Sequence, residues 1–166
     1  GVGVSVVNAL STYLKAEVKR DGKLWQQEYA KGKPQGKVKP VSNARGTGTI
    51  ITFQPDDTIF STTDFNYQYI LDHIRQQAYL TKGIKIVIND QRKKPFATYA
   101  FYFEGGVASY VKHLNHTKEP KHEHVFYVEK QVEAITVEAA LQYTDDYKET
   151  VFCFANNILT RKVVHT

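Results

Sequence analysis

Two glycine-containing segments are the first places where this sequence could do chemistry. Gly1-Val2-Gly3-Val4 stands directly before a run with helical spacing. Glycines there let exposed backbone N–H groups approach an anion at the positive end of a helix dipole. Thr49, which begins a strand-like run, could place its hydroxyl against a purine edge or a bound water. Taken alone, the first segment also fits a plain tight turn and the threonine fits strand propensity.

Two further groups of residues favour structural interpretations. The histidines of residues 113–124 lie close to two glutamates, but they lack the closed ligand spacing of a structural zinc site. Cys153 alternates with phenylalanines in a strand-like run, which is typical of a core or edge position rather than of a nucleophile. We therefore expect no metal site within the chain.

Composition favours a folded protein in an aqueous compartment. Of the 166 residues, 42% are apolar and 23% are charged, which is close to globular averages. No run approaches the roughly 18 uninterrupted apolar residues of a membrane span. The single cysteine cannot form an internal disulfide, which favours the cytoplasm. Because the chain starts with glycine and contains no methionine, we expect it to begin inside a larger protein.

The formal net charge is +5, and many lysines fall in residues 31–45 and 112–121. Such a surplus raises encounter rates with a polyanion, but it is also common on soluble surfaces.

The elements that must position the candidate residues can be predicted from spacing. Residues 1–11 indicate a glycine turn followed by a short helix. Residues 14–18 alternate between apolar and charged side chains, Asp21-Gly22 is typical of a two-residue turn, and residues 23–30 form the returning strand. Residues 31–46 are predicted to be a mobile loop, and residues 48–53 a strand.

The second part of the chain predicts a longer helix and more hairpins. Ser61, Thr62 and Thr63 are expected to cap a helix of about four or five turns that stops at Gly83. Residues 84–89 and 96–103 indicate a hairpin, and Gly105-Gly106 opens another helix. Strand-like runs follow at 125–128, 134–143 and 150–155. Hairpins mixed with isolated helices predict an α+β fold.

Taken in order, these segments resemble a known family. The first, Gly1-Val2-Gly3-Val4-Ser5-Val6-Val7-Asn8-Ala9-Leu10-Ser11, is nearly identical to the second glycine motif of the GHKL ATPases, in the form found in the B subunits of gyrase and topoisomerase IV. The other matching segments are Arg20-Asp21-Gly22-Lys23, Gly46-Thr47-Gly48-Thr49, Phe53-Gln54-Pro55-Asp56, Ile59-Phe60, Tyr102-Phe103-Glu104-Gly105-Gly106 and Asn156-Asn157-Ile158. The resemblance covers essentially the whole chain.

The resemblance implies a particular domain organisation. Residues 1–104 would be the C-terminal part of a GHKL (Bergerat) ATPase α/β sandwich, and residues 105–166 the start of a ribosomal-protein-like transducer domain. After Ile158 the sequence departs from the family, which continues with a Gly-Gly-Thr-His run where this chain has Lys162-Val163-Val164-His165-Thr166. We therefore expect either a frayed end or an incorrectly read sequence there.

The resemblance also implies roles for individual residues in binding ATP. The backbone of Gly1, Val2, Gly3 and Val4 would hold the phosphates. Thr49 would meet the adenine side of the pocket, beside Ile51 as an apolar wall. Arg20 would stand at the pocket rim where aminocoumarin inhibitors bind.

In the family, the general base, the Mg²⁺ ligand and the adenine-binding aspartate precede the glycine motif, and the transducer lysine follows the matched region. We therefore expect no catalytic residue in this chain and no measurable ATP hydrolysis by these 166 residues alone.

The full-length protein would be an ATP-hydrolysing type II DNA topoisomerase. Its partners would be DNA, a gyrase A-type subunit in a heterotetramer and a second copy of its own kind at the ATPase gate, with no membrane. Topoisomerase IV is one alternative. Another is a non-catalytic nucleic-acid-binding module with the transducer fold, with salt-dependent DNA affinity. A third is a poorly folding remnant, because half an ATPase sheet leaves a strand edge unpaired.

Overall fold

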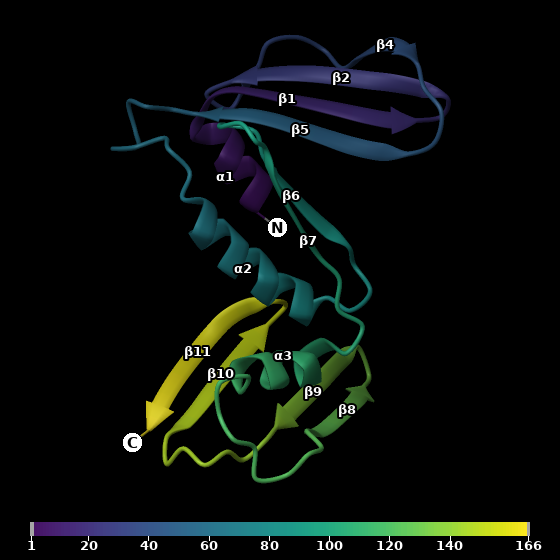
Figure 1. Cartoon of the computed structure of the whole chain (residues 1–166). Helices are drawn as coiled ribbons and strands as arrows, with labels where there is room; N and C mark the ends of the chain where they lie inside the picture. The colour runs from purple at the N-terminus through teal and green to yellow at the C-terminus, as the bar shows by residue number, and fades with distance from the viewer. Residues whose placement is uncertain (1, 166) are drawn as a thin grey trace. The chain divides into compact units, whose positions relative to one another are not determined.

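The computed structural model describes residues 2–165, and the chain forms two compact units, Gly1–Phe65 and Asn66–Thr166 (Figure 1). The segments within each unit pack against one another. The boundary expected between residues 104 and 105 stays a prediction. No helix among the described residues is long and apolar enough to cross a membrane.

The first unit is an antiparallel sheet with one short helix, α1 (Gly3–Ala9), near one end of the strands (Figure 1). Its long strands are β1 (Ser11–Arg20), β2 (Lys23–Ala30) and β5 (Gly48–Pro55), and β1 lies between the other two. The predicted hairpin is confirmed. Asp21 and Gly22 have φ of 53° and 73°, the left-handed pair that a tight turn between twisted strands requires.

Residues 31–46 do not form the mobile loop that the sequence predicts. They contain β3 (Lys33–Pro34) and β4 (Lys39–Asn43), which both pair with the outer edge of β2. The side chains of both strands are exposed, so no apolar alternation marks them. Backbone pairing with a partner strand, which leaves no trace in the side-chain pattern, decides their structure.

An ion pair between the exposed Lys31 and the buried Asp56 joins elements of the first unit. Asp56, just after β5, is 1% exposed, and its Oδ2 lies 2.8 Å from Lys31 Nζ. Its Oδ1 accepts hydrogen bonds from Thr58 Oγ1 at 2.6 Å and from Thr58 N at 3.0 Å. The adjacent Lys31 ammonium, followed by the hydrogen bonds from Thr58, lowers the pKa of Asp56 from 3.8 to about 2.

Backbone bonds complete the same junction. Asp56 N donates to Leu10 O at 3.0 Å, and Lys31 N donates to Ser11 O at 3.0 Å. The residues that follow β2 and β5 therefore both attach to the corner between α1 and β1.

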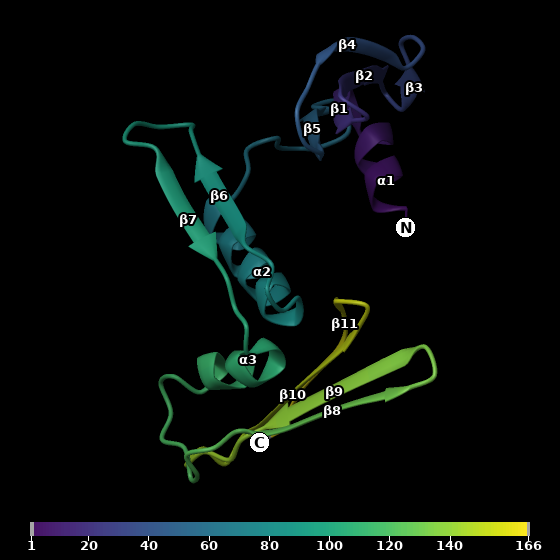
Figure 2. The ribbon, with the colours of Figure 1, turned by 90° about the vertical axis from the view of Figure 1, so that its right-hand side faces the viewer.

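The second unit begins with α2 (Tyr67–Leu80), which packs beside the hairpin of β6 (Ile86–Asp90) and β7 (Ala97–Phe101) (Figure 2). Its core consists of Leu71, Ala78 and Phe101. The predicted helix is present, but the predicted cap at residues 61–63 is wrong. Asn66 is the N-cap, and its Oδ1 accepts from Tyr69 N at 2.9 Å. Serine, threonine and asparagine all serve as caps, so residue type alone did not distinguish them.

The rest of the second unit is α3 (Gly106–Leu114), the hairpin of β8 (Phe126–Val132) and β9 (Ile135–Leu141), and the hairpin of β10 (Glu149–Ala155) and β11 (Ile158–His165). The helix after Gly105 and the three strand-like runs are confirmed. The frayed end is wrong, because β11 pairs with β10 along its length. Asn156 and Asn157, with φ of 48° and 65°, form the turn between them.

Polar contacts connect these hairpins to the residues just after α2. Asn157 Nδ2 donates to Thr81 Oγ1 at 3.0 Å, just after α2. Lys82 Nζ donates to Tyr127 Oη at 2.7 Å and lies 3.0 Å and 3.1 Å from carboxylate oxygens of Glu129 and Glu138. The β8–β9 hairpin is therefore held to the segment that follows α2.

We expect Asp56→Asn to destabilise the chain at neutral pH, with Asp57→Asn as the exposed control. A carboxylate whose pKa is lowered on folding stabilises the folded state above its unfolded pKa, near 3.8, and loses that contribution as pH falls towards about 2. The measurement is urea unfolding followed by fluorescence of Trp25, the single tryptophan. The gap between wild type and Asp56→Asn should shrink below pH 4. A gap of constant size from pH 7 down to 2 would contradict the assigned ion pair.

Asn66→Ala should lower the free energy of unfolding by about 1 kcal/mol, because the N-terminus of α2 loses its side-chain acceptor. Asn66→Ser should restore most of the loss. The control, Thr63→Ala, should change the unfolding free energy by less than about 0.5 kcal/mol. Urea unfolding followed by far-ultraviolet circular dichroism measures all three. Equal losses in the Thr63 and Asn66 variants would show that Asn66 is not the operative cap.

Candidate functional site

Three of the predicted site residues lie on one face of the first unit's sheet. Thr49 stands opposite Val18, and Ile51 stands opposite Ala16. Directly opposed residues of antiparallel strands point to the same face, and alternate residues of one strand share a face. Arg20, two residues beyond Val18, therefore shares the face of Thr49 and Ile51. The β1–β5 pairing brings together residues that are about 30 positions apart in the sequence.

The polar end of this face is open to solvent. The Arg20 side chain is 76% exposed, and its Nε lies 3.5 Å from Asp21 Oδ2. Its main chain is held more firmly, because Trp25 Nε1 donates to Arg20 O at 3.3 Å. Thr49 and Ile51 are exposed as well. The arrangement offers an apolar side chain, a hydroxyl and a guanidinium in that order along one surface.

The glycine segment lies at the start of α1. Gly1 falls outside the described residues. Val2 is the N-cap of α1, and its carbonyl accepts from Val6 N at 3.0 Å, but no side chain caps the helix. A Cβ added to Gly3 would meet nothing within 4 Å, and Val4 is exposed. The backbone here is open to a ligand, but the structure does not place Val2–Val4 on the strand face that carries Arg20, Thr49 and Ile51.

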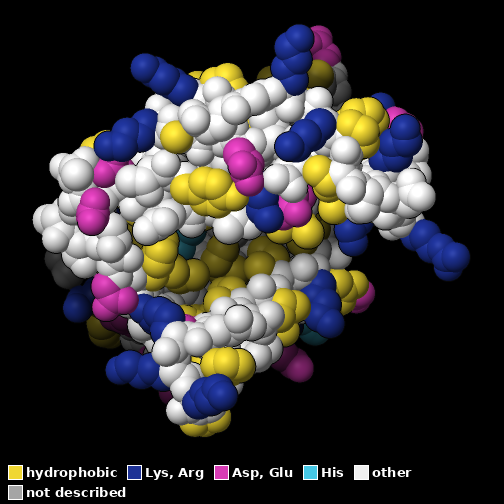
Figure 3. Space-filling view, turned by 90° about the horizontal axis from the view of Figure 1, so that it is seen from above, with side chains coloured by type: hydrophobic (Ala, Val, Ile, Leu, Met, Phe, Trp, Pro, Cys, Tyr) yellow, Lys and Arg dark blue, Asp and Glu magenta, His cyan; other side chains and the backbone are white. Residues whose placement is uncertain are grey.

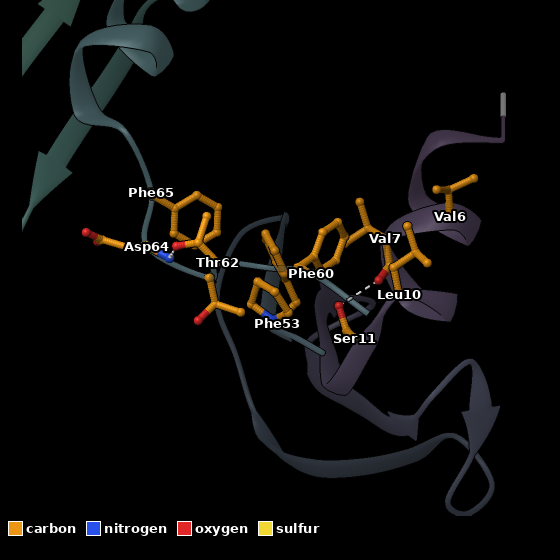
Figure 4. A pocket seen from close by; sticks show the side chains of 11 residues that line it. Val6, Val7, Leu10, Ser11, Phe53, Phe60, Thr62, Asp64 and Phe65 are labelled. Carbon is orange, nitrogen blue, oxygen red and sulfur yellow. Dashed lines mark hydrogen bonds between the residues drawn. The ribbon is translucent and has the colours of Figure 1, made fainter. Parts of the chain in front are cut away.

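Sequence reasoning missed an apolar groove beside α1. The groove has a volume of about 220 Å³ and is bounded by Val7 of α1, by Leu10 just after that helix, by Phe53 of β5, and by Phe60 and Phe65 (Figure 4). The rings of Phe53 and Phe65 meet edge to face with centroids 6.4 Å apart. Alternation along β5 could have placed Phe53 on the same face of the strand as Thr49 and Ile51. No local signal indicated the other two phenylalanines.

Two histidines of the second unit, His116 and His122, bond to backbone atoms. His116 Nδ1 lies 2.6 Å from His113 O. His122 Nδ1 lies 2.6 Å from His124 O, and its Nε2 accepts from Tyr143 N at 3.0 Å. These two bonds require the His122 tautomer with its proton on Nδ1. The His122 ring therefore fixes the path of the loop.

Comparison with known proteins identifies the family. Residues 106–163 match the model of the DNA gyrase B family. The chain is 43% identical to the DNA gyrase B protein of Haloferax volcanii over 166 aligned residues, which cover 98% of this chain and 26% of that relative. The DNA gyrase B protein of Bacillus mycoides is 43% identical over 161 residues, covering 96% of this chain and 40% of that relative. The chain belongs to the DNA gyrase B family. It spans about a quarter to two fifths of the length of these two relatives.

Solved structures of gyrase B share the fold. The 43K ATPase domain of Thermus thermophilus gyrase B, solved in complex with an aminocoumarin, matches with a TM-score of 0.85 and 34% identity, over 97% of this chain and 44% of that chain. The gyrase B protein from Myxococcus xanthus matches with a TM-score of 0.85 and 24% identity, over 95% of this chain and 46% of that chain, which supports the fold alone. The predicted α+β fold of a gyrase B ATPase domain is confirmed.

Because the candidate side chains are exposed, they should contribute little to the stability of this gyrase B chain. Arg20→Gln and Thr49→Val should each change the free energy of unfolding by less than about 0.5 kcal/mol. Leu14→Ala, at a position of β1 that is 2% exposed, should cost about 2–5 kcal/mol and serves as the contrast. Urea unfolding followed by circular dichroism compares them. A loss above about 1 kcal/mol for Arg20→Gln would assign that residue to the framework.

Proposed function

We propose that this chain supplies part of the nucleotide site of a gyrase B protein. The supporting observation is that the chain matches a gyrase B ATPase domain over 97% of its length at 34% identity, while the β1–β5 register puts Arg20, Thr49 and Ile51 on one face. The hydroxyl of Thr49 suits the adenine edge or a bound water, Ile51 suits the flat face of a base, and Arg20 suits the rim.

The phosphates of ATP are assigned to the backbone of Gly1, Val2, Gly3 and Val4. The glycine motif supports this, since glycine lets main-chain N–H groups approach an anion closely. Because Val2, Gly3 and Val4 open α1 and the other three residues lie along the strands, ATP would be held by two separate elements of the first unit. Mg²⁺ would be held by a ligand outside this chain. ATP bound here with its metal would supply the phosphoryl group for hydrolysis.

The activity of the whole protein follows from the family. We infer an ATP-hydrolysing type II DNA topoisomerase of the gyrase kind, in which ATP binding and hydrolysis are coupled to DNA strand passage and supercoiling. Its partners would be DNA, a gyrase A-type subunit in a heterotetramer and a second gyrase B protein at the ATPase gate, in the cytoplasm. The relatives compared above are named as DNA gyrase, which favours gyrase over topoisomerase IV. Residues 105–166 are assigned to the start of the transducer.

A chimera tests the nucleotide assignment. This chain would replace the matching segment of the Thermus thermophilus gyrase B ATPase domain, and a non-hydrolysable ATP analogue would be titrated by calorimetry. The folded chimera should bind, whereas the 166-residue chain alone should neither bind nor hydrolyse ATP. Thr49→Val in the chimera should weaken binding about five-fold, the effect of one lost hydrogen bond. The matched control is Thr52→Val, on the opposite face of β5.

A chimera with a native circular dichroism spectrum that fails to bind the analogue would refute the nucleotide assignment. ATP turnover by the chain alone, above a buffer control, would refute the assignment of the catalytic groups to other parts of the protein.

A further inference from the structure

The charges of the first unit are unevenly distributed. Residues 19–45 contain eight lysines and arginines against two acidic residues. Residues 47–65 contain three aspartates and no lysine or arginine. The basic stretch includes β2, β3, β4 and the turns beside them, so its charge is concentrated at one edge of the sheet.

Four of these residues follow the outer side of β2, and we name them the basic edge: Lys33, Lys37, Lys39 and Arg45. Backbone pairing fixes two of them, because Lys33 stands opposite Ala30 and Lys39 opposite Gln26. Side-chain and backbone bonds hold the segments that carry the others. Gln27 Nε2 donates to Gly36 O at 3.0 Å, next to Lys37, and Ala44 N donates to Gly22 O at 3.0 Å, next to Arg45.

The charges of the basic edge are free. All four residues are exposed, and within residues 2–165 none of them forms an ion pair. Lys31, in the same stretch, is neutralised by Asp56, and Arg20 lies beside Asp21. Figure 3 shows Lys and Arg side chains standing out from the molecular surface. A rigid backbone with unpaired cations is suited to a repeating anion.

The length of the basic edge fits a nucleic acid backbone. The pairing runs from Ala30 to Lys23 of β2, seven residue steps, or about 23 Å at roughly 3.3 Å per step. Duplex DNA carries one phosphate per roughly 3.4 Å on each strand, so the basic edge would face about seven base pairs. Lysines and prolines on an edge strand also discourage pairing with other chains. That role predicts no salt-dependent affinity for DNA.

We propose that the basic edge binds the phosphate backbone of duplex DNA without reading its sequence. The proposal rests on the function inferred above, in which the whole protein acts on DNA. Each phosphate contact releases counterions and contributes about 0.9 to the slope of log affinity against log salt, so four contacts contribute about 3.6.

The test compares two variants of equal net charge. The first changes Lys33, Lys37, Lys39 and Arg45 to Gln, and the second changes the exposed Lys85, Lys93, Lys121 and Lys130 of the second unit to Gln. Fluorescence anisotropy measures binding to a labelled duplex of about 20 base pairs between roughly 50 and 200 mM salt. The basic-edge variant should lose about 3.6 units of slope and at least about ten-fold affinity at the lower salt, and the second variant less than about one unit.

Several results would overturn the proposal. They are no binding of DNA by the wild-type chain, equal losses of slope in both variants, or binding of polyglutamate but not of DNA by the wild-type chain. If the quadruple variant loses its circular dichroism spectrum, Arg45→Gln alone should lower the slope by about one unit, and no change would overturn the proposal. A triple Lys→Arg variant at 33, 37 and 39 should keep the wild-type slope, and a loss there would also overturn it.

Nucleotide binding separates this proposal from the function on which it rests. In the ATPase-domain chimera, the four basic-edge changes should leave binding of the ATP analogue unchanged. An unchanged DNA slope in a chimera that binds nucleotide refutes only the basic edge. A chimera that does not bind nucleotide, beside a chain whose DNA slope depends on the basic edge, refutes only the nucleotide site.

Discussion

The junction of Lys31 and Asp56 with the end of α1 is the constraint on which the position of that helix depends. A helix of seven residues is too short to be stable by itself, and α1 has no side-chain cap. Its position comes from the junction, where Asp56 N and Lys31 N bond to the carbonyls of Leu10 and Ser11. Gly32 completes the contact with φ of +78°, because a Cβ there would lie 3.3 Å from Ala9 Cα. The end of α1 is therefore fixed by residues far along the chain.

This constraint divides the proposed nucleotide site into two parts with different physical supports. The strand face that carries Arg20, Thr49 and Ile51 is held by the hydrogen-bond ladders between β1, β2 and β5. The opening of α1 is held only through the junction, since the helix end is anchored and the helix start is open. A change at Asp56 should therefore disturb phosphate contacts more than contacts to the base.

Local sequence patterns predict individual helices and strands better than they predict which of these elements pack or pair with one another. The β1–β2 hairpin follows from alternation around Asp21-Gly22, and alternation along β5 itself places Thr49 and Ile51 on a common face. The β1–β5 pairing and the groove between Phe53, Phe60 and Phe65 join distant segments, so no local pattern reveals them. β4 was missed because an exposed strand shows no apolar alternation. The residues of β11 depart from the family pattern, so the resemblance does not indicate that strand, although Asn156-Asn157 suits the turn before it.

The residues after β2 show how one stretch can serve both folding and binding. Lys31 forms an ion pair with a buried carboxylate, so its charge is balanced within the unit. Lys33, Lys37, Lys39 and Arg45 meet no acid within the described residues, so their mutual repulsion costs the fold without a compensating contact. On an edge strand that repulsion has a benefit, because it discourages pairing with another sheet. A polyanion would relieve the repulsion when it binds, so the same charges that protect the free edge would favour its occupation by DNA.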